Sequence, residues 1–518
     1  MAPVAPGTSR ADSLVPPPVA REFRAAWMSP VDAGEWPSAP DLDDASQQEE
    51  LRDLLDRAAE VGLNAVILHV RPAADAFYPT DRAPWSSYFV PRGAEEPGYD
   101  PVAFALEEAH RRGLQLHVWV NPFRAAPPER RREPLGAEFI AETNPEWVVR
   151  YGSQRWIDPG DPAARQAVLG ALLEVVYRYD VDAIHLDDYF YPYLEERTTV
   201  RRVPVGRRRY RTVRETATIG FPDDRSWARY GAAAGWRDRG DWRRENVSQF
   251  VRALYDSVKA HKPWVAVGIS PFGIWRPGYP AGVTGLDAYR EIFADSRRWW
   301  REGWVDYLVP QLYWHSDGEQ ARNRRLDAWW RAENVRGRHL WPGMLTMRVA
   351  SGANRWPASE IERQIVGYRA TRAGSAESLG HVHFRLKSLL DDAPGGLGDR
   401  LRAGTYAAPA LPPASPWLGA DRPGTPGVAS CGGAVPAATL TAYGPGRTRW
   451  WFVQWRDAAG RWTGRTLPAT SAVPLAFSDG SRPTAVAVRP VSPTGVEGAP
   501  LVLAPVPAPA AVGASPDR

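Results

Sequence analysis

Short apolar runs alternate with amphipathic helical stretches from residue 21 to about residue 404, and this alternation limits the fold more than any other feature of the chain. Eight of the runs are typical of buried strands. The predicted strands are 23–28, 65–70, 114–120, 183–186, 265–269, 307–312, 340–345 and 381–384. The helices predicted between them include 47–61, 101–112, 162–179, 245–261, 286–302, 320–333 and 359–371. Strand–helix units in this number predict an α/β fold of the (β/α)8 type rather than a doubly wound sheet.

Composition divides the chain into five predicted parts. These are a disordered N-terminal lead at 1–20, a TIM barrel at 21–404, a Pro/Ala-rich linker at 405–415, a small all-β sandwich at 416–505 and a disordered tail at 506–518. The sandwich is predicted from apolar and polar residues that alternate around turn signals, in a pattern that resembles a fibronectin type III domain. The largest insertion, 194–242, follows the fourth strand and is expected to lie over the carboxyl ends of the strands, where barrel enzymes hold their active sites.

The charge pattern argues against a nucleic-acid-binding protein. The 64 Lys+Arg and 60 Asp+Glu residues leave a formal net charge of +4. A nucleic-acid-binding domain clusters its basic residues, whereas here acids and bases are interleaved almost everywhere. The densest basic stretch, 201–214, is expected to be a solvated loop. Cys431 is the one cysteine, which excludes an intramolecular disulfide and a cysteine-based zinc site.

Two sequence signals bear on the compartment. The segment MAPVAPGTSRADSLVPPPVA has neither a charged n-region nor an apolar h-region, so no signal peptide is visible and the sequence by itself predicts a cytoplasmic protein. No apolar run reaches the roughly 18 residues of a membrane span. We therefore expect no transmembrane segment.

Polar side chains are predicted to face the interior of the barrel. In a parallel barrel strand, alternate residues point to the interior and to the helices, and we take the apolar residues as helix-facing. The residues that then point inward are His69, Arg71, Gln115, His117, Trp119, Asn121, His185, Asp187, His381, His383 and Arg385. Barrel interiors are usually filled by branched aliphatic residues, so this polar set predicts a cavity at the strand ends. For any single histidine, a buried ring paired with a neighbour is the more ordinary interpretation.

Carboxylates at the strand ends point to the cleavage of glycosidic bonds. That reaction needs one carboxyl to protonate the departing oxygen and a second group to act as nucleophile, to activate water or to stabilise the oxocarbenium-like transition state. Asp187 fits the second role by its position. For the acid, Asp75 after the second strand ranks slightly ahead of Asp188, while Asp32 after the first strand is a weaker candidate. Turn or N-cap duty is an equally good interpretation of Asp32 and Asp75.

Tryptophans and histidines offer two further interpretations of the same rim. Flat indoles stack on sugar rings, and five tryptophans are predicted at strand ends: Trp36, Trp85, Trp119, Trp275 and Trp314. The histidines His69, His117 and His185, together with Asp187, could instead form a metal site. No HExxH or comparable short-spaced signature supports the metal interpretation.

Long motifs occur in a fixed order along the barrel. They are REFRAAWMSPV, NAVILHVRPAADAFYPT, LHVWVNPFRA, HLDDYFYPY, DWRRENV, GISPFGIWRP and WVDYLVPQLYW. Together they closely resemble the glycosyl-hydrolase-like family 10 domain of bacterial proteins, from about residue 21 to residue 390. The resemblance implies a TIM-barrel glycoside hydrolase that acts on the glycan strands of peptidoglycan after their stem peptides have been removed. It also implies a location in the cell envelope or outside the cell.

The residues that match the signature positions of the family are Arg71, Asp75, Asn121, Arg124, Asp187, Asp188, Gln311, Tyr313 and Trp314. The resemblance does not identify the acid among them. The fifth-strand segment GISPFG has no carboxylate, unlike the amylase-type barrels, so the choice between retention and inversion stays open. The missing signal peptide is a second departure from an exported pattern.

The leading hypothesis is a glycoside hydrolase that needs no cofactor, with Asp187 as the principal catalytic carboxylate and Asp75 and Asp188 as the further candidates. The residues predicted to bind the polysaccharide are Arg71, Trp119, Asn121, Arg124, His185, Gln311, Tyr313, Trp314 and Arg385. One alternative is a barrel that binds glycans without cleaving them, aided by contacts of the C-terminal sandwich with the cell wall or a protein. The other is a metal-assisted polysaccharide deacetylase.

Overall fold

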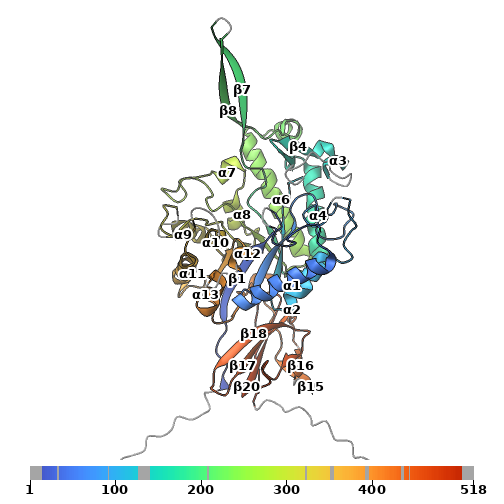
Figure 1. Ribbon diagram of the computed structural model, residues 1–518, viewed down its shortest axis with the longest axis vertical. Helices are drawn as coiled ribbons and strands as arrows, with labels where there is room; N and C mark the ends of the chain where they lie inside the picture. The colour runs from blue at the N-terminus through green and yellow to red at the C-terminus, as the bar shows by residue number, and fades with distance from the viewer. Residues whose placement is uncertain are drawn as a thin grey trace, which may run out of the picture.

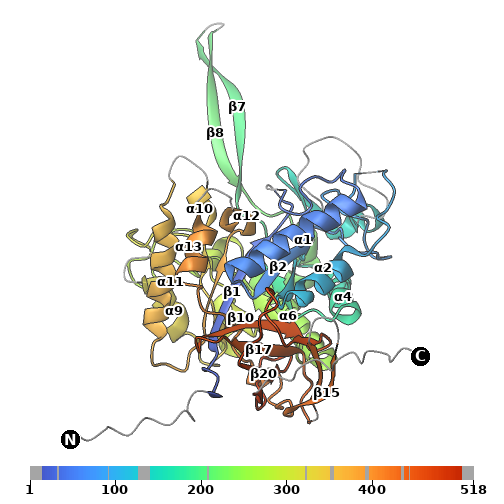
Figure 2. The same ribbon diagram turned by 60° about the horizontal axis from the view of Figure 1, so that its bottom comes forward.

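The predicted strands form one parallel sheet that closes into a barrel (Figures 1 and 2). The computed structural model describes residues 14–504, apart from 32–33, 92, 126–139, 207–208, 321–323, 351–354, 391–395, 433–436 and 443. The barrel strands are β1 (Ala20–Met28), β2 (Ala65–Arg71), β3 (Gln115–Val120), β6 (Ala183–Leu186), β9 (Ala266–Ile269), β10 (Tyr307–Leu308), β11 (His339–Leu340), β12 (Gly343–Met344) and β13 (Leu379–His383). β11 pairs with β10 and β12 with β13, so these two short strands share the seventh position, and β13 pairs with β1 to close the ring. The predicted α/β TIM barrel is confirmed.

Helices surround this sheet, close to where the sequence predicts them. They are α1 (Asp44–Val61), α2 (Pro101–Arg111), α4 (Pro162–Arg178), α6 (Arg239–His261), α7 (Ala288–Glu291), α8 (Ser296–Glu302), α9 (Arg325–Ala332) and α11 (Ala358–Arg372). The prediction of a single helix at 286–302 is wrong, because Phe293 has a positive φ of 55° that interrupts it. Asp295 then caps α8, since its side chain accepts a hydrogen bond from the backbone N–H of Arg298.

The interior of the barrel is filled largely by aromatic residues. Phe23 stacks on Trp341 with ring centroids 3.9 Å apart, and Tyr307 lies against both rings. The Tyr307 hydroxyl bonds with the Nδ1 atoms of His117 and His185, at 2.9 and 3.0 Å. These two histidines therefore point inward, as predicted.

The inward direction predicted for His381 and His383 is wrong. Val382 belongs to the interior cluster, and the two histidines on either side of it both bond to the hydroxyl of Tyr406. Tyr406 packs among the residues between the sheet and the helices. The parity is reversed because an apolar valine fills the interior, while the outward histidines find polar partners in Tyr406 and in the nearby carboxylate of Glu22.

The C-terminal strands form two antiparallel sheets below the barrel in Figure 1, and Figure 2 shows them from beneath. The first contains β15 (Pro426–Gly432), β16 (Ala437–Ala442) and β19 (Val473–Pro474); the second contains β17 (Trp450–Arg456), β18 (Trp462–Pro468), β20 (Ala485–Val491) and β21 (Leu501–Leu503). Trp451, Trp455 and Val488 belong to a core of their own between these strands. The sheets contact the barrel through Arg449, which bonds to Asp182 just before β6. They therefore lie at the amino ends of the barrel strands.

The insertion after β6 contains a long two-stranded arm, β7 (Glu195–Gly206) and β8 (Arg209–Ile219). The arm projects away from the barrel at the top of Figure 1. The sequence predicts a solvated loop at 201–214; its described arginines are exposed as predicted, but the stretch pairs as two strands and is not a loop. The arm extends away from the barrel, whereas the sequence predicts that this insertion covers the carboxyl ends of the strands.

The boundaries predicted for the five parts stay predictions, and most of the lead and the tail fall outside the described residues. None of the helices in the described ranges has the length and apolar character needed to cross a membrane.

Candidate active site

A cavity of about 250 Å³ opens at the carboxyl ends of the barrel strands. Side chains within or after β1, β2, β3, β6, β9, β10 and β13 contribute to it. They are Trp27, Ser29, Val31, Glu35, His69, Trp119, Arg124, Asp187, Asp188, Tyr189, Tyr193, Ser270, Gln311, Tyr313, Phe384 and Arg385. This is the end of the barrel at which TIM-barrel enzymes carry out their chemistry.

Two adjacent carboxyl groups, Asp187 and Asp188, form the acidic part of the cavity. The Asp187 Oδ1 atom accepts hydrogen bonds from the Asp188 backbone N–H at 2.9 Å and from Gln311 Nε2 at 3.2 Å. The Tyr193 hydroxyl donates to Asp188 Oδ2. The first turn after β6 thus brings together three of the predicted residues and adds Tyr193, which the sequence analysis does not single out.

Burial raises the pKa of both carboxyl groups. The pKa of Asp187 is raised further by the negative charge of Asp188 and by the hydrogen bond that its protonated form donates to Asp188. Tyr193 and Asp187 donate to Asp188 and hold its pKa lower than burial alone would. Burial and the charge of Asp188 thus raise the pKa of Asp187, and the two titration steps belong to the pair as a whole.

A cation lies beside this pair. The guanidinium of Arg124 stacks 4.7 Å from the ring centroid of Tyr189, and its charge lowers the pKa of both carboxyl groups. The Tyr189 hydroxyl accepts a hydrogen bond of 2.7 Å from Asn121 Nδ2. Arg124 is thus held against a fixed aromatic ring in the cavity.

Asn121 organises the opposite wall without lining the cavity. It is fully buried, and its Nδ2 donates to His69 Nε2 at 3.0 Å while its Oδ1 accepts from Trp119 Nε1 at 3.1 Å. The rings of His69 and Trp119 stack 3.8 Å apart. Because His69 Nε2 accepts this bond, its Nδ1 carries the proton and donates to Ser29 at 2.9 Å. Burial keeps the pKa of His69 well below its usual range, so the stack is neutral.

His185 lies one layer deeper than the cavity. Its Nε2 accepts a hydrogen bond of 3.2 Å from Trp27 Nε1 and lies 3.1 Å from the Ser270 hydroxyl. Trp27 and Ser270 line the cavity, whereas His185 is fully buried behind them. The structure therefore places His185 as a support for two lining residues.

Tyr313, Gln311 and Arg385 line the cavity as the sequence predicts. Burial and the charges of Asp187 and Asp188 raise the pKa of Tyr313 well above its usual range, so its hydroxyl stays a proton donor. Arg385 follows Phe384, to which it is joined by a cis peptide bond, and its Nε lies 3.7 Å from a carboxylate oxygen of Glu35.

Glu35 is a lining residue that the sequence analysis misses. Its carboxylate accepts hydrogen bonds from the backbone N–H groups of Ser29 at 2.9 Å and Lys387 at 2.7 Å. Burial raises its pKa to about 7. Glu35 belongs to the segment SPVDAGEW, in which the sequence predicts Asp32 as the candidate carboxylate. Asp32 lies outside the described residues.

Glu35 should make the stability of the protein depend on pH. Its folded-state pKa lies above the ordinary value of 4.5, so its contribution to stability is fully present below pH 4.5 and is lost as pH rises through 7. Relative to the wild type, we expect the free energy of unfolding of Glu35→Gln to rise by ~3 kcal/mol between pH 4.5 and pH 8. Urea unfolding at several pH values measures this shift. The same shift in Glu49→Gln, at an exposed glutamate on α1, would contradict the assignment to Glu35.

Asp75 and Arg71 lie outside the cavity. Asp75 is fully buried, and its carboxylate accepts from the Ala73 backbone N–H at 2.9 Å and from the Ser86 hydroxyl at 2.6 Å. The pairing of β2 with β3 shifts register between His69 and Arg71, so the alternation used in the prediction ends before Arg71. Asp75 therefore fixes the loop after β2. Burial raises the pKa of Asp75, although the positive charge of Arg71 acts to lower it.

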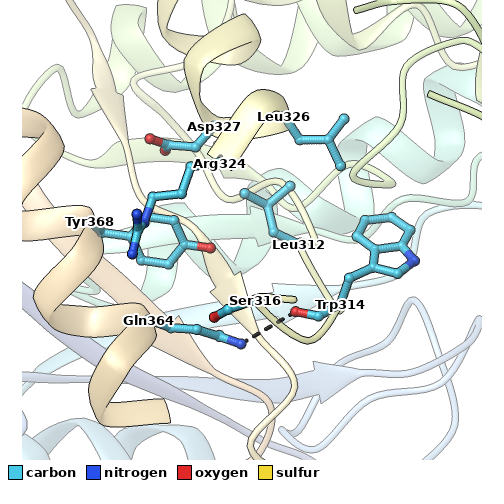
Figure 3. Close-up of a pocket in the computed structure, with 8 residues that line it drawn as sticks. All are labelled: Leu312, Trp314, Ser316, Arg324, Leu326, Asp327, Gln364 and Tyr368. Carbon is cyan, nitrogen blue, oxygen red and sulfur yellow. Dashed lines mark hydrogen bonds between the residues drawn. The ribbon is translucent and has the colours of Figure 1, made fainter. Parts of the chain in front are cut away.

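Trp314 lines a different pocket of about 60 Å³, next to α9 and α11 (Figure 3). Its carbonyl oxygen accepts a hydrogen bond of 3.3 Å from Gln364 Nε2, which the figure draws as a dashed line. Of the five tryptophans predicted at the rim, Trp119 alone lines the cavity at the strand ends, and Trp27 is an addition to the prediction. The indoles that line this cavity are therefore those of Trp27 and Trp119.

The histidines weighed as metal ligands bond to separate partners. His69 bonds to Ser29 and Asn121, whereas His117 and His185 meet at Tyr307. Over the described part of the chain, no three His, Cys, Asp or Glu side chains are grouped so that they could hold a metal ion.

A TIM barrel with paired carboxyls, arginines and aromatic rings at the carboxyl ends of its strands has the architecture expected of a glycoside-hydrolase-like protein. Comparison with known proteins identifies the particular family. The family model described as Glycosyl hydrolase-like 10 matches residues 22–358, and the chain belongs to this family.

Two curated relatives share most of the barrel. The chain is 37% identical over 413 residues to Glycosyl hydrolase YngK of Bacillus subtilis, an alignment that covers 78% of this chain and 76% of the relative. It is 31% identical over 350 residues to Glycosyl hydrolase DigH of Escherichia coli K12, which covers 62% of this chain and 74% of the relative. Among solved structures, the PgaB (BpsB) glycoside hydrolase domain of Bordetella bronchiseptica aligns with 14% identity and a TM-score of 0.45, over 74% of this chain and 98% of that domain.

Proposed function

We propose that the protein hydrolyses O-glycosidic bonds of a polysaccharide in the cavity at the carboxyl ends of the barrel strands. The observation that carries this proposal is the adjacent pair Asp187 and Asp188 in the cavity, in which burial and the negative charge of Asp188 raise the pKa of Asp187 well above its usual range. A carboxyl with a raised pKa is what general acid catalysis of glycosidic cleavage requires.

The closeness of the two carboxyls favours one division of labour. Pairs that flank the bond are about 5–5.5 Å apart in retaining enzymes and about 6.5–9.5 Å apart in inverting enzymes, and a hydrogen-bonded pair is closer than either. Asp187 and Asp188 therefore act on the same side of the bond. In substrate-assisted glycosidases, a group of the sugar itself takes the second role.

We assign the steps accordingly, which makes Asp187 the acid and Asp188 the stabilising carboxylate, whereas the sequence favours Asp187 for the second role and Asp75 or Asp188 for the acid. Asp187 donates its proton to the leaving glycosidic oxygen while the carbonyl oxygen of the 2-acetamido group of the sugar attacks the anomeric carbon. The ionised Asp188 stabilises the positive charge that develops, and the Tyr313 hydroxyl is available as a hydrogen-bond donor to the sugar. Water then opens the cyclic intermediate and gives a proton back to Asp187.

Peptide-free peptidoglycan strands are the proposed substrate. Their sugars carry acetamido groups, and removal of the stem peptides leaves a free carboxylate on alternate sugars. Arg124 and Arg385 line the cavity. Their positive charges can attract a carboxylate of the glycan. On this proposal the protein acts on the cell envelope.

Mass spectrometry of digested glycans tests the proposed function. We expect new reducing ends from peptide-free glycan strands incubated with the purified chain. Pull-down of these strands without any new reducing end, from them or from chitin oligomers and α-glucans, would instead favour a binding protein. Acetate release that a chelator abolishes would favour a deacetylase.

Replacing Tyr193 by Phe should move the acidic limb of the pH–rate profile to higher pH. The Tyr193 hydroxyl donates to Asp188 and thereby lowers its pKa, so its loss raises the pH at which Asp188 ionises. We expect a shift of about one pH unit, because one hydrogen bond to a charged group is worth roughly 1.5–3 kcal/mol and part of it is recovered from water. Rates measured between pH 4 and pH 8 give the limb. Tyr177→Phe, at an exposed tyrosine on α4, is the control, and equal profiles for the two variants would contradict the role of Tyr193.

A further inference from the structure

The arm formed by β7 and β8 starts at the rim of the candidate active site. Its first residue, Glu195, follows Tyr193 closely, and the Tyr193 hydroxyl contacts Asp188. The base of the arm is fixed because Tyr151 OH accepts from the Glu195 backbone N–H at 2.9 Å and donates to the Ile219 carbonyl at 3.0 Å. The arm therefore holds both of its strands next to the cavity and projects from there (Figure 1).

The outer part of the arm is strongly basic. Residues 200–214 contain seven arginines and no Asp or Glu. The arginines whose side chains are described there are all exposed: Arg201, Arg202, Arg211 and Arg214. The one ion pair found for them joins Arg201 to Glu215 at 4.0 Å, with both side chains more than half exposed. Contacts of this kind are worth little, so the positive charge is available to a partner.

Arginines lie on both faces of the arm. In an antiparallel pair, directly opposed residues point to the same face. Arg214 is opposite Val200 and Arg202 is opposite Thr212 on one face, while Arg201 and Arg211 lie opposite Val213 and Val203 on the other. Exposed apolar side chains accompany them: Val200 is 58% exposed and Tyr210 is 64% exposed.

This arrangement selects among anionic partners. A flat membrane surface can contact only one basic face of the arm at a time. A flexible polymer can lie along one face and continue onto the other. β7 has 12 residues, so the arm is roughly 40 Å long, which is enough to run beside several sugars. Apolar side chains such as Tyr210 can pack against sugar rings.

We propose that the arm binds a carboxylate-bearing polysaccharide strand outside the cavity and thereby guides the strand to Asp187. This inference rests on the proposed function, because the bound strand is the one that the cavity cleaves. The arm contributes affinity for the polymer, and the cavity carries the reaction.

Kinetics with substrates of different charge and length test the arm. In the variant R201Q/R202Q/R211Q/R214Q, we expect KM for peptide-free peptidoglycan strands to rise about tenfold at low salt, with kcat unchanged. Raising the salt concentration should raise the KM of the wild type toward that of the variant, because salt screens exposed charges. A short neutral chitin oligomer should be cleaved at the same rate by both proteins. The matched control R252Q/R290Q/R402Q/R461Q changes four exposed arginines elsewhere and should behave as the wild type.

Three results would overturn the proposal. One is an equal KM for the arm variant and the matched control on the anionic strands. Another is an equal loss on long neutral chitin. The third is an arm variant that binds duplex DNA or vesicles containing phosphatidylserine less tightly than the wild type does but binds the glycan equally well.

Co-sedimentation with insoluble peptide-free sacculi separates the arm from the catalytic proposal. If the wild type cleaves nothing but sediments about tenfold more strongly than the arm variant, the proposed hydrolysis fails and binding by the arm holds. If both proteins cleave and sediment equally, the arm proposal fails and the proposed hydrolysis holds.

Discussion

Replacing Asp187 by Asn should lower kcat on peptide-free glycan strands by about 10²–10⁴-fold, the usual contribution of a positioned general acid. The amide keeps the shape of the carboxyl and still accepts hydrogen bonds from the Asp188 backbone N–H and from Gln311. It has no acidic proton to give to the leaving oxygen. Because burial raises the pKa of the carboxyl that it replaces, a neutral amide suits this environment and folding should survive. Circular dichroism with thermal unfolding checks this.

A matched pair of variants makes this prediction specific. Asp224→Asn makes the same chemical change at a side chain that is 89% exposed, and we expect normal rates from it. Asp188→Asn removes the charge that raises the pKa of Asp187, so its residual activity should be confined to lower pH than that of the wild type. Full activity of Asp187→Asn on digested sacculi would contradict the assignment of Asp187 as the general acid.

Much of the barrel could be predicted because its strands are short, apolar and regularly spaced. The alternation of Ile184 and Leu186 with His185 and Asp187 gave the correct direction for both polar residues. The same logic was wrong for His381 and His383, because an apolar residue of a barrel strand can face either the helices or the interior. Nothing local to the strand shows that the partner of these histidines is Tyr406, which lies over twenty residues further along.

The candidate site could be predicted where a residue directly follows a strand and not where tertiary contacts decide. Asp187, Asp188, Gln311 and Tyr313 line the cavity as expected. Asp75 follows a strand too, but a register shift and the Ser86 hydroxyl turn it into a loop clamp. Glu35 reaches the cavity because backbone groups of Ser29 and Lys387 hold it there, and Lys387 is 352 residues away in the chain.

The arm shows a different limit of the sequence pattern. Arginines on both faces of two strands have no hydrophobic alternation, so the stretch resembled a loop. What identifies the strands is their mutual pairing, which begins at Glu195 opposite Ile219 and depends on the fixed base at Tyr151. A pattern of burial cannot reveal strands that bury neither face.

Replacing Asp182 by Ala should lower the free energy of unfolding by about 3–5 kcal/mol, the usual cost of removing one partner from a buried ion pair. Its carboxylate accepts from the Leu116 backbone N–H at 2.8 Å, from His110 Nε2 at 2.9 Å and from Arg449 Nη2 at 3.2 Å. These partners belong to the barrel and to the C-terminal sheets. The substitution therefore leaves a buried guanidinium and a buried amide with fewer acceptors, and urea unfolding measures the loss.

The pH dependence of this loss separates the ion pair from simple packing. The charges of His110 and Arg449 hold the pKa of Asp182 well below its usual range, so its contribution is present above the unfolded pKa and is lost as pH falls through the folded one. The gap between wild type and variant should narrow in acid. Asp180→Ala, at a side chain that is 37% exposed, is the control, and we expect it to cost about 1 kcal/mol or less. Equal costs for the two variants would mean that the buried Asp182 contributes no more than the half-exposed Asp180 to joining the C-terminal sheets to the barrel.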